Sequence, residues 1–179
     1  MGLKVLDEVP HDIEMQAGET IWLHDFGMIT RDGSDIDVAA IKEAFEATFD
    51  RVWRNEVEDD GFNGMVTFSG LTWRQIVVLR AYCKYLRQAG IPFSEQYMVE
   101  TLSRNAGIAR DIVSLFEELF EPGRQTKKAA ADRIRKKIAA ALDQVQNLDE
   151  DRILRRYLNL VESTLRTNFY QPDEGGNPK

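Results

Sequence analysis

The chain has 179 residues, of which 43% are hydrophobic, and it carries a formal net charge of −7 with a pI near 5.0. A chain of this length can bury about 70% of the surface that its unfolded form exposes, which is enough for a folded core. The acidic balance argues against a protein that binds nucleic acid or anionic lipid through its overall charge.

No segment of the sequence suits membrane insertion or secretion. Apolar runs such as Ile76 to Leu79 are far too short to cross a bilayer, and the N-terminus lacks a charged segment followed by an apolar one. The single cysteine, Cys83, cannot form an internal disulfide, which agrees with a reducing compartment. We therefore expect a cytoplasmic protein that does not contact a membrane.

The first thirty or so residues carry the alternating pattern of β-strands. Pro10 and the Ala17-Gly18 pair mark turns between them. The pattern predicts two or three short strands, with a hairpin over residues 11–27. Three strands cannot hide both faces of a sheet, so this piece either leans on helices or belongs to a larger sheet. The alternating apolar residues are Leu3, Val5, Ile13, Met15, Ile21 and Leu23.

From Ser34 onward the period of the apolar residues becomes helical. A first helix is predicted after a cap at Ser34 or Asp35, with one apolar stripe that covers a core. A second is predicted from about Thr72 to Gln88, and Gly90 and Pro92 end it. The stripe of the first helix comprises Val38, Ile41, Phe45, Phe49 and Val52.

Further helices are expected in the second half. Ser94 is a cap for one, Thr126 for another, and the periodic run between them predicts a third that ends before Pro122-Gly123. Residues 148–171 are predicted to form one last helix, capped by Asp149. Its expected features are the staple Leu148 with Ile153, the ion pairs Asp151–Arg155 and Glu162–Arg166, and the stripe Leu154, Tyr157, Val161, Thr164, Leu165.

Motifs for cofactors and metals are missing. The chain has no glycine-rich turn between a strand and a helix and no P-loop lysine motif, and one cysteine with two separated histidines cannot build a common zinc site. His24 and Asp25 would point to opposite faces of a strand, so we favour a sheet-face or turn position for His24 over a general base. Cys83 shares the apolar side of its helix, which favours a core position.

Two basic stretches allow more than one interpretation. Arg80, Lys84 and Arg87 lie near Tyr82 and Tyr85, a combination that could stack on nucleic-acid bases but fits the rim of a core better. The run Lys127–Lys137 fits a solvated helix face better than a docking surface for an acidic partner. The acidic loop 55–61 is a possible partner for it within the chain.

Long strings of the sequence resemble one family. DDGFNGMVTFSGLTWRQIVVLRAYCKYLRQAGIPFSEQYMVETL and LDEDRILRRYLNLVESTLRTNFYQ resemble the segment that precedes the catalytic domain of the very large bacterial NAD-specific glutamate dehydrogenases. MGLKVLDEVPHDIEM and IWLHDF resemble the end of the preceding ACT-like regulatory region. The resemblance spans residues 1–171, and it departs from the family pattern at Gly64, where a long basic residue is expected.

This resemblance implies a division of the chain and a role for it. Residues 1–31 would be the β-rich end of an ACT-like domain, 32–171 a helical connecting domain and 172–179 a disordered tail. The segment would hold no catalytic or cofactor residue, while the parent enzyme would use NAD to oxidise L-glutamate to 2-oxoglutarate and ammonium. Its partners would be the catalytic and regulatory domains of the same polypeptide, and the parent could be a homo-oligomer. The residues expected to contact those domains are Arg80, Lys84, Arg87, Arg152, Arg155, Arg156 and Arg166.

The expected fold is mainly α, an irregular multi-helix bundle with a small N-terminal hairpin of two to three strands. One alternative function is a free-standing helical interaction module that binds an acidic protein through the Lys127–Lys137 face. Another is binding of RNA or DNA through Arg80, Tyr82, Lys84 and Tyr85.

Overall fold

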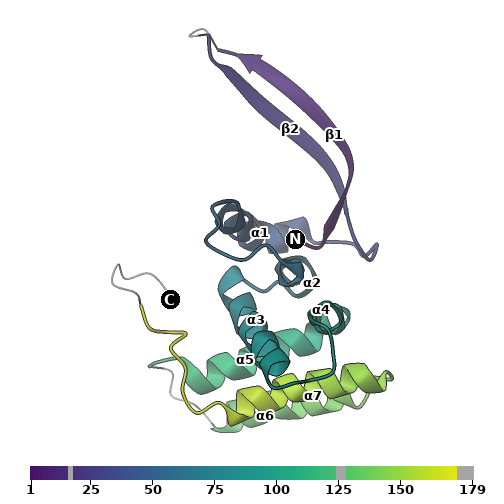
Figure 1. Ribbon diagram of the computed structural model, residues 1–179, viewed down its shortest axis with the longest axis vertical. Helices are drawn as coiled ribbons and strands as arrows, with labels where there is room; N and C mark the ends of the chain where they lie inside the picture. Colours follow the sequence, from purple (N-terminus) through teal and green to yellow (C-terminus); the bar gives the residue numbers. More distant parts are fainter. Residues whose placement is uncertain (16–17, 124–127, 173–179) are drawn as a thin grey trace.

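The computed structural model describes residues 1–15, 18–123 and 128–172, and it places a two-stranded antiparallel sheet before a helical body (Figure 1). The mainly helical fold is the one predicted. In the described ranges, no helix is long and apolar enough to cross a membrane. The elements are β1 (Leu3–Glu14), β2 (Thr20–Thr30), α1 (Val38–Trp53), the 3-10 helix η1 (Gly61–Gly64), α2 (Met65–Ser69), α3 (Trp73–Gln88), α4 (Glu95–Arg104), α5 (Ala106–Phe120), α6 (Lys128–Leu142) and α7 (Leu148–Ser163).

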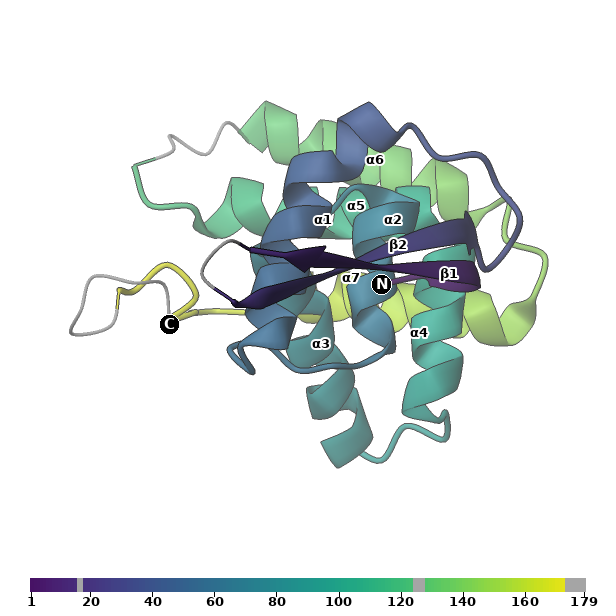
Figure 2. The ribbon, with the colours of Figure 1, turned by 90° about the horizontal axis from the view of Figure 1, so that it is seen from above.

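The hairpin of β1 and β2 rises away from the helices, and Figure 2 shows it from above, crossing over α1 and α2. Its pairing runs from Leu3 opposite Thr30 to Glu14 opposite Thr20, with an irregularity between Val5 and Asp7. The predicted hairpin over residues 11–27 is therefore too short. Pro10 was expected to mark a turn but lies within β1, where a strand with an unpaired edge tolerates a residue without an N–H.

Helix α1 differs from its prediction in two ways. Asp37, rather than Ser34 or Asp35, is the N-cap, and its carboxylate accepts the Ala40 N–H at 3.2 Å. The apolar stripe does not cover a core along its length, because Thr48 is the buried residue of this helix while Val38 and Phe49 are exposed. The expectation of a core-facing stripe was therefore wrong at Val38 and Phe49, whereas Phe45 packs against the core.

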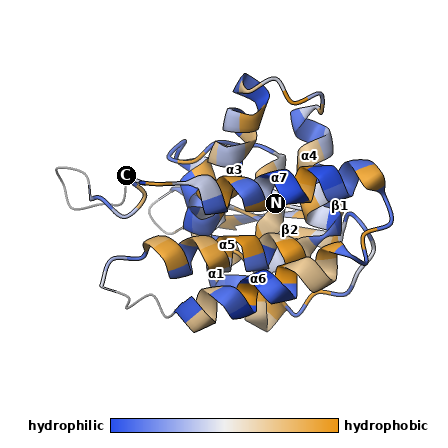
Figure 3. Cartoon of the chain, turned by 90° about the horizontal axis from the view of Figure 1, so that it is seen from below, coloured by the Kyte–Doolittle hydropathy of each residue, from blue (hydrophilic) through white to orange (hydrophobic). Residues whose placement is uncertain are grey.

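The core lies among η1 and helices α2 to α7. Helix α5 carries the largest share of it, and Figure 3 shows apolar residues along much of α5 and alternating patches on α7. The periodic run predicted for α5 supplies buried side chains, which confirms that prediction. Of the stripe predicted for α7, Leu154, Tyr157 and Val161 are buried. The fully buried large side chains are Phe62, Met65, Ile76, Leu79, Met98, Leu102, Ile112, Leu115, Ile138, Leu142, Ile153 and Tyr157.

Local sequence signals account for several helix ends. Thr72 forms a capping box with Gln75, so α3 begins where it was predicted. The Ser94 hydroxyl accepts the Tyr97 N–H at 3.1 Å and caps α4, as predicted. Gly70 adopts a φ of 62° at the end of α2, a left-handed conformation that costs glycine little. The proposed cap Thr126 falls outside the described residues.

The last helix is shorter than predicted. The Asn147 side chain accepts the N–H groups of Asp149 and Glu150 and caps α7, so Asp149 is not the cap. The predicted staple of Leu148 with Ile153 is wrong as well, because Leu148 is the first helical residue and is exposed, whereas Ile153 is buried. The helix ends at Ser163, and the side chain of Leu165 is 91% exposed. An exit segment, residues 164–172, then follows. Of the two predicted ion pairs, Asp151–Arg155 is present at 2.8 Å, whereas Glu162 pairs with Arg135 at 2.9 Å instead of Arg166.

Candidate functional site

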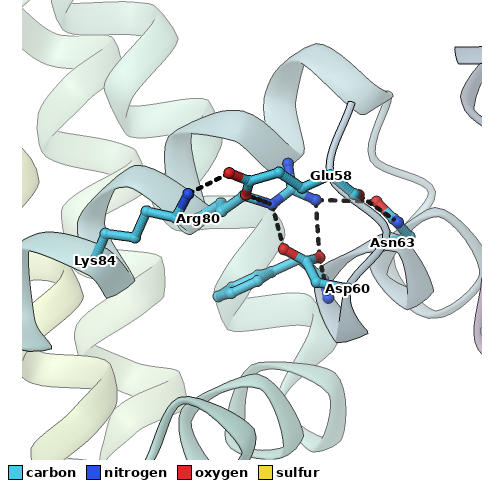
Figure 4. Close-up of polar contacts among 6 residues, drawn as sticks. Glu58, Asp60, Asn63, Arg80 and Lys84 are labelled. Carbon is cyan, nitrogen blue, oxygen red and sulfur yellow. Dashed lines mark hydrogen bonds and ion pairs between the residues drawn. The ribbon is translucent and has the colours of Figure 1, made fainter. Parts of the chain in front are cut away.

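A polar cluster lies where α3 meets the loop before η1 (Figure 4). The Arg80 guanidinium donates to both carboxylate oxygens of Asp60, at 2.6 Å from Nε and 2.9 Å from Nη2, and Nη2 also donates to the Asn63 side chain at 3.0 Å. Arg80 is only 5% exposed. Two parallel bonds to one carboxylate favour arginine at this position and fix the loop on the helix.

The acidic loop is neutralised by α3 and α1. Glu58 pairs with Arg80 at 3.2 Å and also with Lys84, and Glu56 pairs with Arg51 of α1 at 2.7 Å. The sequence suggested that this loop pairs with the basic stretch 127–137, but the described residues show it paired with α1 and α3. In that stretch, Lys137 pairs with Asp111 at 2.6 Å.

The base of the hairpin rests on η1 and α2. The Thr67 hydroxyl donates to the Met1 carbonyl at 2.8 Å, and Gly2 adopts a φ of 78° beside Gly64. A Cβ built on Gly64 would lie 3.3 Å from the Phe68 ring and 3.4 Å from the Cα of Gly2. The backbone of Gly2 thus occupies the space beside Gly64, so the long basic side chain expected from the family pattern would meet the hairpin base.

The exit segment is fastened to α3. Arg74 donates to the Phe169 carbonyl, and its guanidinium lies 4.5 Å from the centre of the Phe169 ring. The Tyr82 hydroxyl lies 2.8 Å from the Thr164 hydroxyl, which itself donates to the Leu160 carbonyl, so Tyr82 is the donor. Burial raises the pKa of Tyr82 and lowers that of Arg74.

Aromatic side chains complete this attachment and leave a groove beside it. The ring centres of Phe116 and Phe169 are 5.4 Å apart in an edge-to-face pair, and Tyr170 stacks on Phe116 at 6.4 Å. Between α3 and the exit segment lies an open groove of about 580 Å³, floored by Val77, Val78, Ala81 and Phe116. The exit segment lines the other side of this groove with polar side chains, so that an apolar floor faces Thr164, Arg166, Thr167, Asn168 and Gln171.

The residues expected to contact other domains fall into two groups. Arg80 is buried and paired with Asp60 of the same chain, whereas the other six residues are exposed. On that surface, Arg87, Arg156 and Arg166 form no ion pair with any described residue. The paired ones are Lys84 with Glu58, Arg152 with Asp149, and Arg155 with Asp151 and Asp143. Contacts of these six with other domains stay a prediction.

The residues of the nucleic-acid hypothesis do not form a surface platform. Arg80 is buried against Asp60, and Tyr82 is half-buried with its hydroxyl bonded to Thr164. Only Lys84 and Tyr85 remain exposed, and Lys84 is paired with an acid. This arrangement matches the alternative reading, in which the aromatic residues border a core.

The two groups weighed for catalysis from the sequence, His24 and Cys83, are respectively paired and buried. His24 lies on the exposed sheet, as predicted, with Nδ1 2.6 Å from a Glu8 carboxylate oxygen across the hairpin. Cys83 is buried in the core, as predicted, and burial raises the pKa of its thiol, the opposite of what a nucleophile needs. No group of three or more potential metal ligands occurs among the described residues.

Two apolar surfaces are exposed in the structure, and only the one on the hairpin was anticipated from the sequence. On α1, Phe49 and Trp53 stack at 6.0 Å, and Trp53 is 77% exposed. The hairpin also exposes large apolar side chains on its strands, among them Trp22 and Phe26. Hydrophobic periodicity identified the α1 stripe but could not show that Val38 and Phe49 stay exposed among the described residues.

Three family profiles match successive parts of the chain. The glutamate dehydrogenase ACT3 domain matches residues 1–41, glutamate dehydrogenase helical motif 3 matches 57–122, and the catalytic domain of bacterial NAD-glutamate dehydrogenase matches 137–179. The first match covers the hairpin and the second the body from the acidic loop through α5. The third begins inside α6, whereas the resemblance places the catalytic region after residue 171. The predicted domain limits at residues 31 and 171 stay a prediction.

Similar proteins agree with these profiles. The chain is 41% identical to an NAD-specific glutamate dehydrogenase of Pseudomonas aeruginosa over its whole length, 34% identical to that of Halomonas elongata, also over its whole length, and 38% identical to that of Mycobacterium tuberculosis over 98% of its length. It spans about 11% of the length of each of these relatives. No solved structure gives a significant match. From the matched profiles and relatives, the chain belongs to the bacterial NAD-specific glutamate dehydrogenase family, as a segment that begins in the ACT3 region and includes helical motif 3.

Proposed function

We propose that this chain is a non-catalytic connecting and regulatory segment of an NAD-dependent glutamate dehydrogenase. The parent enzyme would convert L-glutamate, NAD and water to 2-oxoglutarate, ammonium and NADH in the cytoplasm. The observation that carries the proposal is the succession of ACT3, helical motif 3 and catalytic-domain matches along one packed chain. A segment that overlaps an ACT3 match at one end and a catalytic-domain match at the other would set the relative position of the two regions.

Helix α3 supplies the mechanical link in this proposal. At one side, Arg80 holds the loop and η1, on which the base of the hairpin rests. At the other, Arg74 and Tyr82 hold the exit segment. Because α3 is packed in the core between these attachments, it would transmit a displacement of the hairpin base to the exit segment.

The side chains of this chain support a structural role over chemistry of its own. Cys83 is shielded, His24 is paired with Glu8, and Arg80 is bound to Asp60. We therefore assign NAD and glutamate to other parts of the parent enzyme. The exposed cations, such as Arg156 and Arg166, would contact the regulatory and catalytic domains of the same polypeptide, and the parent would be a homo-oligomer.

An assay of the isolated chain tests the absence of catalysis. Purified residues 1–179 should give no glutamate-dependent formation of NADH and no heat signal on titration with NAD. Turnover comparable with that of an intact dehydrogenase would overturn the proposal, since the chemistry would then lie within this segment.

Substitution of Arg74 in a longer dehydrogenase that contains this segment tests the link. Arg74→Ala should loosen the exit segment and lower kcat/KM, by up to about 10²-fold if reacting groups move by about 1 Å. The matched control is Arg133→Ala, which removes an exposed arginine of α6 and should leave kcat/KM unchanged. Equal effects of the two variants, or no effect of Arg74→Ala, would remove the mechanical role.

A further inference from the structure

The hairpin is the least covered part of the molecule. Almost every residue of β1 and β2 is exposed, and apart from each other the two strands make only isolated contacts with other described elements. A two-stranded hairpin is marginally stable in water by itself. Its exposed apolar side chains include Val5, Leu6, Val9, Ile13, Ile21, Trp22, Leu23, Phe26, Met28 and Ile29.

The register shows which backbone groups face outward. The Met15 N–H donates to the Glu19 carbonyl at 2.8 Å, and the Arg31 N–H donates to the Gly2 carbonyl at 3.0 Å, which marks a hydrogen-bonded pair at each end of the hairpin. Hydrogen-bonded and non-hydrogen-bonded pairs alternate along an antiparallel ladder. The non-hydrogen-bonded pairs, whose N–H and C=O groups point to the outer edges, are therefore Glu14/Thr20, Asp12/Trp22, Pro10/His24, Glu8/Phe26, Val5/Met28 and Leu3/Thr30.

The outer edge of β1 is unsuited to a further strand. Pro10 occupies an outward position and has no N–H to donate. The strand is also irregular between Val5 and Asp7, where the Asp7 carboxylate accepts the Gly27 N–H at 3.0 Å. Its remaining outward residues near the turn are acidic: Glu8, Asp12 and Glu14. Prolines, bulges and charges are the features that protect a terminal edge.

The outer edge of β2 has the opposite character. Its outward residues each provide an N–H, the strand contains no proline, and the extra residue of the irregularity belongs to β1. None of these residues carries a carboxylate, and two are the exposed aromatics Trp22 and Phe26. The outward set between the turn and the base is Thr20, Trp22, His24, Phe26 and Met28. Unpaired donors in such a row form a template for strand addition.

We infer that the outer edge of β2 receives a further β-strand, supplied by the ACT region of the same polypeptide outside this chain, and that β1 is the terminal strand of the resulting sheet. The inference rests on the proposed function. The occupant follows from the ACT3 match over the hairpin and from the relatives, of whose length this chain spans about 11%. The incoming strand would carry apolar side chains at alternate positions, because it must cover Trp22 and Phe26 on one face of the sheet.

Hydrogen exchange of single amides tests the inference. In the 179-residue chain, the outward amides of both strands should exchange rapidly. In a longer dehydrogenase that contains this segment, the amides of Trp22, His24 and Phe26 should slow by at least about tenfold, while those of Glu8 and Asp12 stay fast. Mass spectrometry with fragmentation to single residues measures both sets. Slowing of the β1 amides, or of neither set, would overturn the inference.

Proline substitutions give a matched pair on the two edges. His24→Pro removes an outward N–H without removing a donor of the β1–β2 ladder, and Asp12→Pro does the same on β1. In the longer protein, His24→Pro should abolish the protection of Trp22 and Phe26, whereas Asp12→Pro and the side-chain control His24→Ala should preserve it. Equal loss in both proline variants would contradict the assignment of the edge.

Two further measurements separate the other outcomes. Protection of the β2 amides in the isolated chain, together with a dimer in sedimentation, would assign the edge to a second copy and overturn the proposed occupant. Glutamate-dependent formation of NADH by the longer protein is measured in parallel. If that activity is absent, the proposed function fails, whereas the exchange pattern still reports which edge is paired.

Discussion

The hairpin and the helical body use similar apolar residues with opposite results. Ile112 in α5 is fully buried, whereas Ile21 in β2 is 48% exposed. In the body, Arg80 is buried and bound to Asp60, whereas in the hairpin the contact between His24 and Glu8 lies on the surface. The core among η1 and α2 to α7 therefore buries its own apolar side chains, whereas the hairpin, like Phe49 and Trp53 of α1, leaves large apolar side chains exposed.

The strongest expected effect comes from the buried arginine. Arg80→Met removes the partner of Asp60, whose side chain is only 20% exposed, and should lower the free energy of unfolding by about 3 to 5 kcal/mol. Urea unfolding followed by circular dichroism measures the loss. The control in the hairpin is His24→Ala, which breaks an exposed pair and should cost less than about 1 kcal/mol. A similar cost for the two variants would erase the contrast between the regions.

A matched isoleucine pair tests the contrast in packing. Ile112→Ala should lower the free energy of unfolding by about 2 to 5 kcal/mol, because it leaves a cavity in the core. Ile21→Ala should cost less than about 1 kcal/mol in this chain, since its side chain is already half in solvent. The same unfolding experiment compares them. A large loss from Ile21→Ala in the isolated chain would mean that the hairpin is already covered.

Alkaline pH should weaken the body through Cys83. Burial raises the pKa of this thiol above its ordinary value of 9.0 in the folded state, so the unfolded chain loses its proton first. The stabilisation is complete below the ordinary value and is lost as the pH rises through the folded value, with a slope of up to about 1.4 kcal/mol per pH unit.

Cys83→Ala provides the control for this pH dependence. It should reduce the alkaline slope, while any cost of the lost sulfur is the same at each pH. Urea unfolding between about pH 8 and 10.5 measures both slopes. An unchanged slope would show that the thiol does not contribute and would point to Tyr157 and Tyr82, whose pKa values burial also raises.

The sequence predicted most of the helices and strands because caps and apolar periods depend on residues that are close together in the chain. The capping residues Thr72 and Ser94 act within one turn, and apolar periods of three and four identify the buried faces of α5 and α7. The strand character of the first thirty residues was equally clear. Its extent was underestimated, because Pro10 suggests a turn unless the strand is known to lie at an edge.

The errors concern features that depend on distant residues. Periodicity marks Val38 and Phe49 as one apolar face but does not say whether this chain supplies its partner. Arg80 was expected on a surface stripe, yet Asp60, twenty residues earlier, folds over it. The early end of α7 coincides with contacts from α3, a helix far away in the sequence, to the exit segment.

The exit segment is a third region, and substitutions can show whether it is held like the body or exposed like the hairpin. Tyr82→Phe removes one hydrogen bond to Thr164 and should cost about 1 kcal/mol, with faster amide exchange confined to residues 164–171. Tyr157→Phe is the matched control: this hydroxyl is buried without a hydrogen bond to a described oxygen or nitrogen, so its removal should cost less than Tyr82→Phe. Unfolding and hydrogen exchange measure the two effects.

If Tyr82→Phe leaves both unchanged, the exit segment is held by its aromatic contacts alone. If it accelerates exchange there, the segment is part of the body, because its attachment to α3 then depends on a specific bond and not only on apolar surface.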